Sequence, residues 1–283
     1  MSHSILWPGR VLTRVCLALI GFASINCAIA QGNIRIGGTG TGTALVQHLI
    51  ESYQKLHPGV EVTALIPPMG SNGGLRALAA GTIQVAVVSF PINQQTVPDD
   101  TAKLNSIPWV RTPMVFTGRN IAGRKQLSMG QVADIYAGQV TRWPDGSPLR
   151  LVTRTERETD TTLLRGLSGE MDIAVAQAAK RIGLPFAEND LDNQNLLERT
   201  PGSFGVIGLG QVLLSNSVLK PASLDGVAPS AANLRNGSYR FAKSLYLVVP
   251  DTASPATLEF CRYLQSPGVI ASIERFGFIP QAR

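Results

Sequence analysis

The sequence predicts an α/β fold of two lobes, each a mostly parallel sheet flanked by helices. Strand and helix patterns alternate along residues 34–89, which is typical of βα units in an open sheet. Residues 83–89 are almost continuously apolar, as expected for a strand covered on both faces. A polar segment and then a Gly- and charge-rich segment at 117–125 follow, and they indicate that the chain crosses to a second lobe.

The first thirty residues have the pattern of a secretory signal peptide. Arg10 and Arg14 precede an apolar run at 15–23, and small residues at 28–30 offer a cleavage site. The alternative is a membrane anchor, but the run is shorter than the ~20 residues that a spanning helix needs. We expect cleavage near Ala30 and a periplasmic or secreted location.

The composition excludes several classes of protein. A chain of 283 residues with 44% hydrophobic content can bury a sizeable core, and its net charge of +6 comes without a run of Lys and Arg. Nucleic acid and membrane-surface binding are therefore not expected. Cys261 is the one cysteine outside the signal peptide, so no internal disulfide can form, and its neighbours predict a core position on an amphipathic helix.

The first strand, which begins at Ile34, runs into alternating Gly and Thr at 37–43 and then into a helical pattern. Free amides at a helix N-terminus and threonine hydroxyls donate hydrogen bonds to anions, so a small oxyanion fits here. The nucleotide-binding motifs are not met, because Thr43 stands where the dinucleotide fingerprint requires Gly and the P-loop requires Lys. A tight turn with a helix N-cap is the alternative.

Periodicity and end signals place the other elements. Ser128 and Gln131 form a capping box. Polar turns link strand to helix at 37–43, 67–74 and 154–162, and we expect them to converge on one cleft. The expected helices are 45–56, 75–80, 128–136, 163–167, 174–182, 255–264 and 267–276. The later strands are expected at 60–64, 83–89, 109–116, 149–153, 205–208 and 245–249.

Four segments and one arginine occur in an order known from a protein family. Residues 70–86 carry a Gly-Ser-x-Gly-Gly turn before a helix and a buried strand, and 132–143 contain Ile-Tyr-x-Gly-x-Val-x-x-Trp. A Pro-Gly-x-x-Gly turn begins at 201, Gly-Phe-Ile-Pro lies at 277–280, and Arg154 falls where that family has its anion-binding arginine. Over most of residues 33–283 the chain thus resembles the phosphate-type solute-binding proteins of ABC transporters.

The resemblance implies a periplasmic-binding-protein-like fold whose lobes close on a tetrahedral anion. Residues 31–115 plus 243–283 would form lobe 1, and 116–242 would form lobe 2. It implies an ABC permease as partner, a monomer and no cofactor. The implied ligand-binding residues are Thr39, Gly40, Thr41, Ser71, Ser89, Arg154, Thr159, Asp160 and Thr161.

Two departures from the family pattern bear on the ligand. Ser89 stands where phosphate binders often have an Asp that accepts a hydrogen bond from a protonated phosphate. Glu158 and Asp160 stand within the turn where the family has Ser-Gly-Thr donors. We hypothesise that Asp160 takes the acceptor role, with nearby threonines as donors.

Each of these residues also has a plainer interpretation. Asp160 could be the N-cap of the helix that follows it, and Ser71 could cap its own helix. Arg154 could form a surface ion pair with Glu156 or Glu158.

The expected function is capture of a small oxyanion, phosphate first, by an exported protein that serves an ABC importer. The alternatives are sulfate, molybdate or tungstate as the ligand, or a sensor or surface module that does not transport. An enzyme is not expected, because the mature chain holds two histidines, His48 and His57, and shows no catalytic or metal-ligand cluster.

Overall fold

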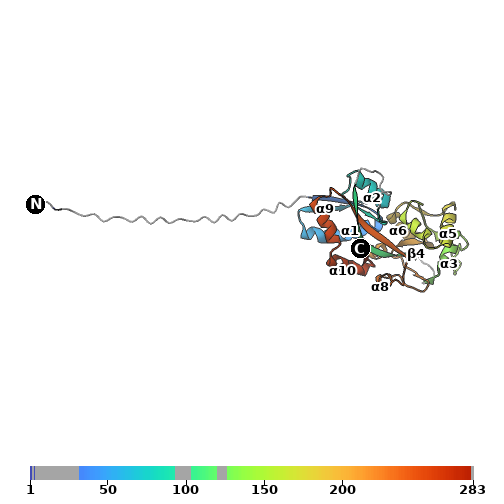
Figure 1. Cartoon of the computed structure of the whole chain (residues 1–283). Coiled ribbons are helices and arrows are strands. Elements are labelled where there is room, and N and C mark those ends of the chain that lie inside the picture. Colours follow the sequence, from blue (N-terminus) through green and yellow to red (C-terminus); the bar gives the residue numbers. More distant parts are fainter. Residues whose placement is uncertain (2, 4–31, 93–102, 120–125, 282–283) are drawn as a thin grey trace.

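The computed structural model describes residues 1, 3, 32–92, 103–119 and 126–281 (Figure 1). Most of the predicted signal peptide, with its cleavage site near Ala30, lies outside these residues, and so does most of the segment at 117–125. Within the described ranges, no helix has both the length and the apolar character needed to cross a membrane.

One mixed sheet of eight strands runs through the molecule, in the order β2-β1-β3-β11-β4-β9-β6, with β12 added on β4. Its first part is parallel: β1 (Gly32–Gly38) pairs with β2 (Val60–Ala64) on one side and with β3 (Val85–Val88) on the other. The helices α1 (Gly40–Leu56) and α2 (Gly70–Ala79) provide the connections. The predicted succession of βα units is confirmed.

Two long antiparallel strands carry the sheet from one lobe into the other. β11 (Ala242–Pro250) lies between β3 and β4 (Leu104–Thr117). The end of β4 then pairs with β9 (Ser203–Gly208), which pairs with β6 (Arg150–Leu151). Both lobes therefore share β4, and the expected lobe boundaries at 115 and 243 fall inside β4 and β11.

Helices cover the two parts of this sheet separately. Figure 1 shows α1, α2, α9 and α10 around the first part, and α3 and α5 at the opposite end of the molecule. The remaining helices are α3 (Met129–Ala137), α4 (Thr159–Arg165), α5 (Gly169–Ala179), α6 (Asp190–Arg199), α7 (Leu209–Leu214), α8 (Ala231–Arg235), α9 (Pro255–Leu264), α10 (Pro267–Ile273) and the 3-10 turn η1 (Glu274–Phe276). The short strands are β5 (Gln126–Leu127), β7 (Thr153–Arg154), β8 (Phe186–Ala187), β10 (Ser223–Leu224) and β12 (Ile279–Pro280).

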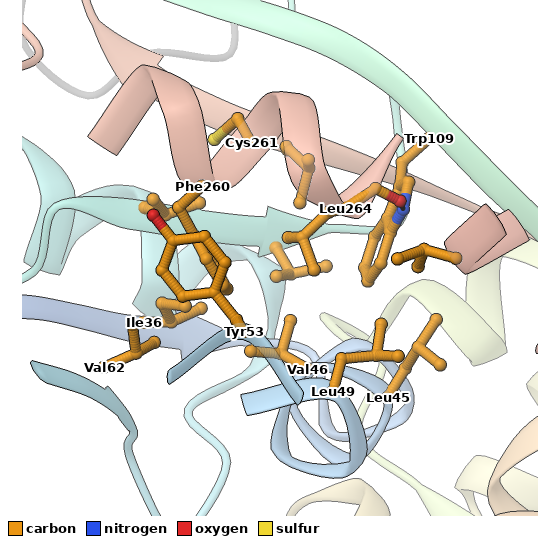
Figure 2. Close-up of a cluster of buried hydrophobic side chains, with 14 of the residues drawn as sticks. Ile36, Leu45, Val46, Leu49, Tyr53, Val62, Trp109, Phe260, Cys261 and Leu264 are labelled. Atoms are coloured by element: carbon orange, nitrogen blue, oxygen red, sulfur yellow. Dashed lines mark hydrogen bonds between the residues drawn. The ribbon is translucent and has the colours of Figure 1, made fainter. Parts of the chain in front are cut away.

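Each lobe has its own hydrophobic core. In lobe 1, α1 and α9 pack their apolar faces on the sheet, with Tyr53 and Phe260 in contact (Figure 2). Cys261 lies in this core, as predicted, and burial raises the pKa of its thiol to about 12. In lobe 2, Phe116 and Phe204 stack within a second core.

Several elements differ from the sequence prediction. The helices α1, α4 and α5 begin before the expected residues 45, 163 and 174, and the prediction contains no counterpart of α6, α7 and α8. α2 begins at Gly70, because the Gly-Ser-x-Gly-Gly residues form its first turns, with Gly70 at φ +70°. The strand expected at 149–153 consists of the two short strands β6 and β7, which pair with different partners. The last expected helix gives way to a 3-10 turn at Glu274.

Candidate functional site

Arg154 is the centre of a buried cluster of charges. It ends β7, its side chain is 2% exposed, and its guanidinium contacts three carboxylates. Nη1 lies 2.9 Å from Asp190 Oδ1 and 3.2 Å from Asp160 Oδ2, and Nη2 lies 3.0 Å from Glu158 Oε2. The ion pair with Glu158 that the alternative interpretation named is formed, but the guanidinium is buried and not at the surface, and no ion pair with Glu156 is formed among the described residues.

Lys243 supplies the second cation from the other side of the cluster. It lies on β11, its Nζ is 2.6 Å from Asp160 Oδ1 and 3.6 Å from Asp190 Oδ2, and its side chain is 2% exposed. The cluster thus joins a strand shared by both lobes to the helices α4 and α6 of lobe 2.

The carboxylate of Asp190 sits at the N-terminus of α1. Its Oδ2 accepts hydrogen bonds from Thr39 Oγ1 at 2.9 Å and from the backbone amide of Thr41 at 3.0 Å. Gly40 makes room for it, since a Cβ there would lie 2.4 Å from the Cβ of Asp190. The Gly-Thr turn therefore holds an oxyanion group, and that group belongs to the protein itself.

A set of hydroxyls lies where α2 of lobe 1 faces α4 of lobe 2. Ser71 Oγ is 2.9 Å from Ser89 Oγ and 3.4 Å from Thr159 Oγ1. Ser71 Oγ also accepts the backbone amide of Ser89 at 3.0 Å, so it ties α2 to the end of β3. The second and third polar turns meet here.

Two other interpretations from the sequence need correction. Asp160 is not the N-cap of its helix, since Glu158 occupies that position and Asp160 lies one residue inside α4. Ser71 does not cap α2, whose N-cap residue is Met69. The hydroxyl of Thr161 donates to the backbone oxygen of Thr155 at 2.8 Å, within its own turn.

The opposite charges in the cluster keep Asp190 and Lys243 ionised although both are buried. Burial opposes the charge of Asp190, but Lys243 and Arg154 outweigh it, so the pKa of its carboxyl lies well below its usual range. Burial likewise works against the charge of Lys243, yet Asp160 and Asp190 outweigh it and the pKa of the ammonium is raised. For Glu158, burial raises the pKa, and the attraction of Arg154 offsets this only in part.

The balance of charge in the cluster favours an ion-pair network over a metal site. In the part of the chain that the structure describes, no group of three or more His, Cys, Asp or Glu side chains is placed to hold a metal ion. Arg154 and Lys243 take up the carboxylates instead.

Sequence reasoning missed two members of this site, Asp190 and Lys243. The sequence does contain a sign of Lys243. Every second residue of this segment is buried, and Lys243 takes one of these positions, between Phe241 and Leu245. Asp190 had none, because an acidic residue in the first turn of a helix is ordinary. Of the predicted residues, the structure gathers Thr39, Gly40, Thr41, Arg154 and Asp160 around Asp190, and Ser71, Ser89 and Thr159 beside one another.

The fold and the site define a class of protein: two α/β lobes that meet at a buried cluster of charged and hydroxyl side chains. Residues 28–267 match the PBP superfamily domain. The chain belongs to the PBP superfamily. The predicted resemblance to phosphate-type solute-binding proteins is confirmed by its relatives.

These relatives include curated proteins and solved structures. The chain is 23% identical over 260 residues to the phosphate-binding protein PstS of Bacillus subtilis, covering 89% of this chain and 81% of that one. A putative phosphate ABC transporter substrate-binding protein of Clostridium perfringens, solved with bound phosphate, has a TM-score of 0.74 at 17% identity and covers 89% of this chain and all of its own. An ABC-type phosphate transport receptor of Vibrio cholerae has a TM-score of 0.62 at 20% identity, with 88% of this chain and all of that chain covered.

Proposed function

We propose that the protein is an exported binding protein that captures a small oxyanion, phosphate first, between its lobes and delivers it to an ABC permease. One observation carries the proposal: donors from both lobes converge on the carboxylate of Asp190. Thr39 and Thr41 donate from lobe 1, and Arg154 donates from lobe 2. These groups are the donors that an oxyanion requires, charge-assisted on one side and at a helix N-terminus on the other.

The names of the relatives support phosphate as the first candidate. The curated relative is described as a phosphate-binding protein, and the two solved structures are described as phosphate transport proteins. In this proposal the hydroxyls of Ser71, Ser89 and Thr159 complete the ligand shell next to Arg154. The protein acts as a monomer, in the periplasm or outside the cell, after the signal peptide is removed near Ala30.

A fully deprotonated oxyanion such as sulfate is the second candidate. Ser71, Ser89 and Thr159 form a group of hydroxyls, and each can donate a hydrogen bond to an oxygen that carries no proton. Ser89 stands where, by the resemblance, phosphate binders often have the Asp that favours a protonated phosphate. Molybdate and tungstate have the same donor requirements.

The test is calorimetric titration of the signal-free protein with phosphate, sulfate, molybdate and tungstate, with chloride as the control. A thermal-shift assay with the same panel serves as the second readout, since a ligand at 100 times its Kd stabilises the folded state by ~2.7 kcal/mol. We expect binding of phosphate or of another tetrahedral oxyanion, and loss of it in Arg154→Met. The proposal is wrong if no oxyanion binds either the natural protein or a variant that lacks the Asp190 carboxylate.

Transport is tested separately, by uptake of labelled phosphate in cells with and without the gene. Lower uptake in the deletion strain at limiting phosphate is expected for an importer component. Unchanged uptake with intact binding would point to the sensor or surface module.

A further inference from the structure

We propose that Asp190 is a built-in competitor: its carboxylate occupies the oxyanion position of the site, and a free oxyanion binds only when this side chain leaves. The inference rests on the proposed function and names the residue that sets the affinity of the site. It concerns a residue that lies 36 positions beyond Arg154 in the sequence and begins helix α6, whereas Arg154 ends strand β7.

The contacts of Asp190 use the donors that a free oxyanion would need. Its Oδ1 accepts from Arg154 Nη1 at 2.9 Å, and its Oδ2 accepts from Thr39 Oγ1 and the amide of Thr41. Both oxygens of the carboxylate therefore have donors, and the donors come from opposite lobes. A phosphate oxygen placed on the same donors would coincide with a carboxylate oxygen.

Packing leaves no space for both groups. Asp190 rests directly on the backbone of Gly40, with 2.4 Å between its Cβ and the position that a Cβ of Gly40 would take. Its side chain is 5% exposed. A tetrahedral anion at the start of α1 thus requires α6 to move Asp190 away from α1.

The charge balance gives the same result. Two buried cations, Arg154 and Lys243, face the two buried carboxylates of Asp160 and Asp190, and Glu158 lies at the edge with its side chain 22% exposed. A dianion added to this cluster would be a buried charge without a partner, which is strongly unfavourable. When Asp190 leaves, it frees the positive charge that a ligand can use.

A tethered carboxylate also acts on the lobes. Asp190 belongs to α6 of lobe 2, while Thr39 and Thr41 belong to lobe 1. The same bonds therefore hold the cleft shut without a free ligand. Because the carboxylate is tethered beside the donors, it competes for them in every molecule and weakens the binding of a free anion.

The experiment measures phosphate affinity by calorimetry in the natural protein and in Asp190→Ala, Asp190→Asn and Asp192→Asn. Asp192 is the matched control: it lies two residues further along α6 and accepts the backbone amide of Glu188, outside the cluster. We expect both Asp190 variants to bind phosphate at least tenfold more tightly than the natural protein, and Asp192→Asn to bind as the natural protein does.

Formate provides a second measurement that does not depend on phosphate. In Asp190→Ala, free formate can take the place of the deleted carboxylate, so it should raise the Tm of this variant and leave the Tm of the natural protein unchanged. Small-angle scattering without added anion should show a larger radius of gyration for Asp190→Ala than for the natural protein. Asp190→Asn keeps the shape of the side chain and serves as the second variant where Asp190→Ala does not fold on its own.

The outcomes separate the two proposals. If the natural protein binds phosphate and the folded Asp190 variants bind no more tightly, the competitor role is overturned while the proposed function stands. If no oxyanion binds to any variant, the proposed function fails, and the competitor role fails with it.

Discussion

The hydroxyl of Thr39 and the carboxylate of Asp190 are hydrogen-bonded at 2.9 Å although 151 residues separate them in the sequence. The bond joins the turn after β1 to the first residue of α6, and Arg154 and Lys243 lie on the far side of the same carboxylate. The stability of the protein, and the binding proposed at this position, should therefore depend on this cluster.

Arg154→Met removes the cation that contacts three carboxylates. Because this leaves buried charge uncompensated, the free energy of unfolding should fall by about 3–5 kcal/mol, measured by urea denaturation at neutral pH. The control is Arg165→Met, whose pair with Asp172 is about half exposed, and the expected loss there is about 0–1 kcal/mol. Similar losses for the two variants would contradict a buried ion-pair role for Arg154.

Lys243 and Asp160 should be energetically coupled, because their charged atoms lie 2.6 Å apart in a buried site. Lys243→Met and Asp160→Asn should each destabilise the protein, and the double variant should lose less than the sum of the two by about 0.5–3 kcal/mol. The exposed pair Lys55 and Glu51 is the matched control, where near additivity is expected. If the loss of stability in the double variant equals the sum of the two single losses, the pairing of Lys243 and Asp160 is refuted.

The pH dependence of stability should carry the sign of the Asp190 shift. Its folded-state pKa lies below the unfolded value of about 3.9, so its contribution is present above that pH and is lost as the pH falls below it. Denaturation between pH 7 and pH 3 should therefore show a shallower acid loss in Asp190→Asn than in the natural protein. If the two proteins lose stability equally as the pH falls, a carboxylate held by Arg154 and Lys243 is contradicted.

Glu158 should show the opposite sign. Burial raises the pKa of its carboxyl, so ionisation is less favourable in the folded protein, and stability is lost as the pH rises through about 4.3 and beyond. Glu158→Gln should be relatively more stable at pH 7 than at pH 4 when each is compared with the natural protein. The same denaturation series measures this, and a constant difference across the range would reject it.

Gly40→Ala tests the close approach of α6 to α1. An added methyl would meet the Cβ of Asp190 at 2.4 Å, so the variant should lose about 1–3 kcal/mol of stability through overpacking. Gly169→Ala is its control, because Gly169 is also the first residue of a helix and has no atom within 4 Å of the added methyl. Thermal denaturation compares the two variants, and an equal effect would argue against tight packing at Gly40.

The sequence was informative wherever the signal is local. The helix at 255–264 is observed with the predicted bounds, because Ser254 caps it and its apolar residues recur on one face. The capping box of Ser128 and Gln131 is present with both of its hydrogen bonds. The strand expected at 149–153 divides in two because strand pairing depends on distant partners, which a local pattern does not contain.

The site shows the same limit. The three polar turns do come together, as predicted, through the contacts of Asp190 and Ser71. The first two follow the parallel strands β1 and β2, which bring their turns to one edge, but the third follows β7, which lies in a separate two-stranded sheet. The ion pairs of Asp160 could not be predicted from the sequence, because one of its two cationic partners, Lys243, lies far from it along the chain. Whether the predicted donors bind a ligand stays a prediction until binding is measured.

The strands β4 and β11 have a mechanical consequence for any such binding. Two-lobed proteins can open about loose connections, but here both lobes are hydrogen-bonded to the same 14-residue strand, which β11 accompanies over nine residues. Separating the lobes therefore requires this ribbon to twist or bend along its length. The stiffness of β4 and β11, and not only the strength of the ion pairs, therefore limits how far the two lobes can move apart.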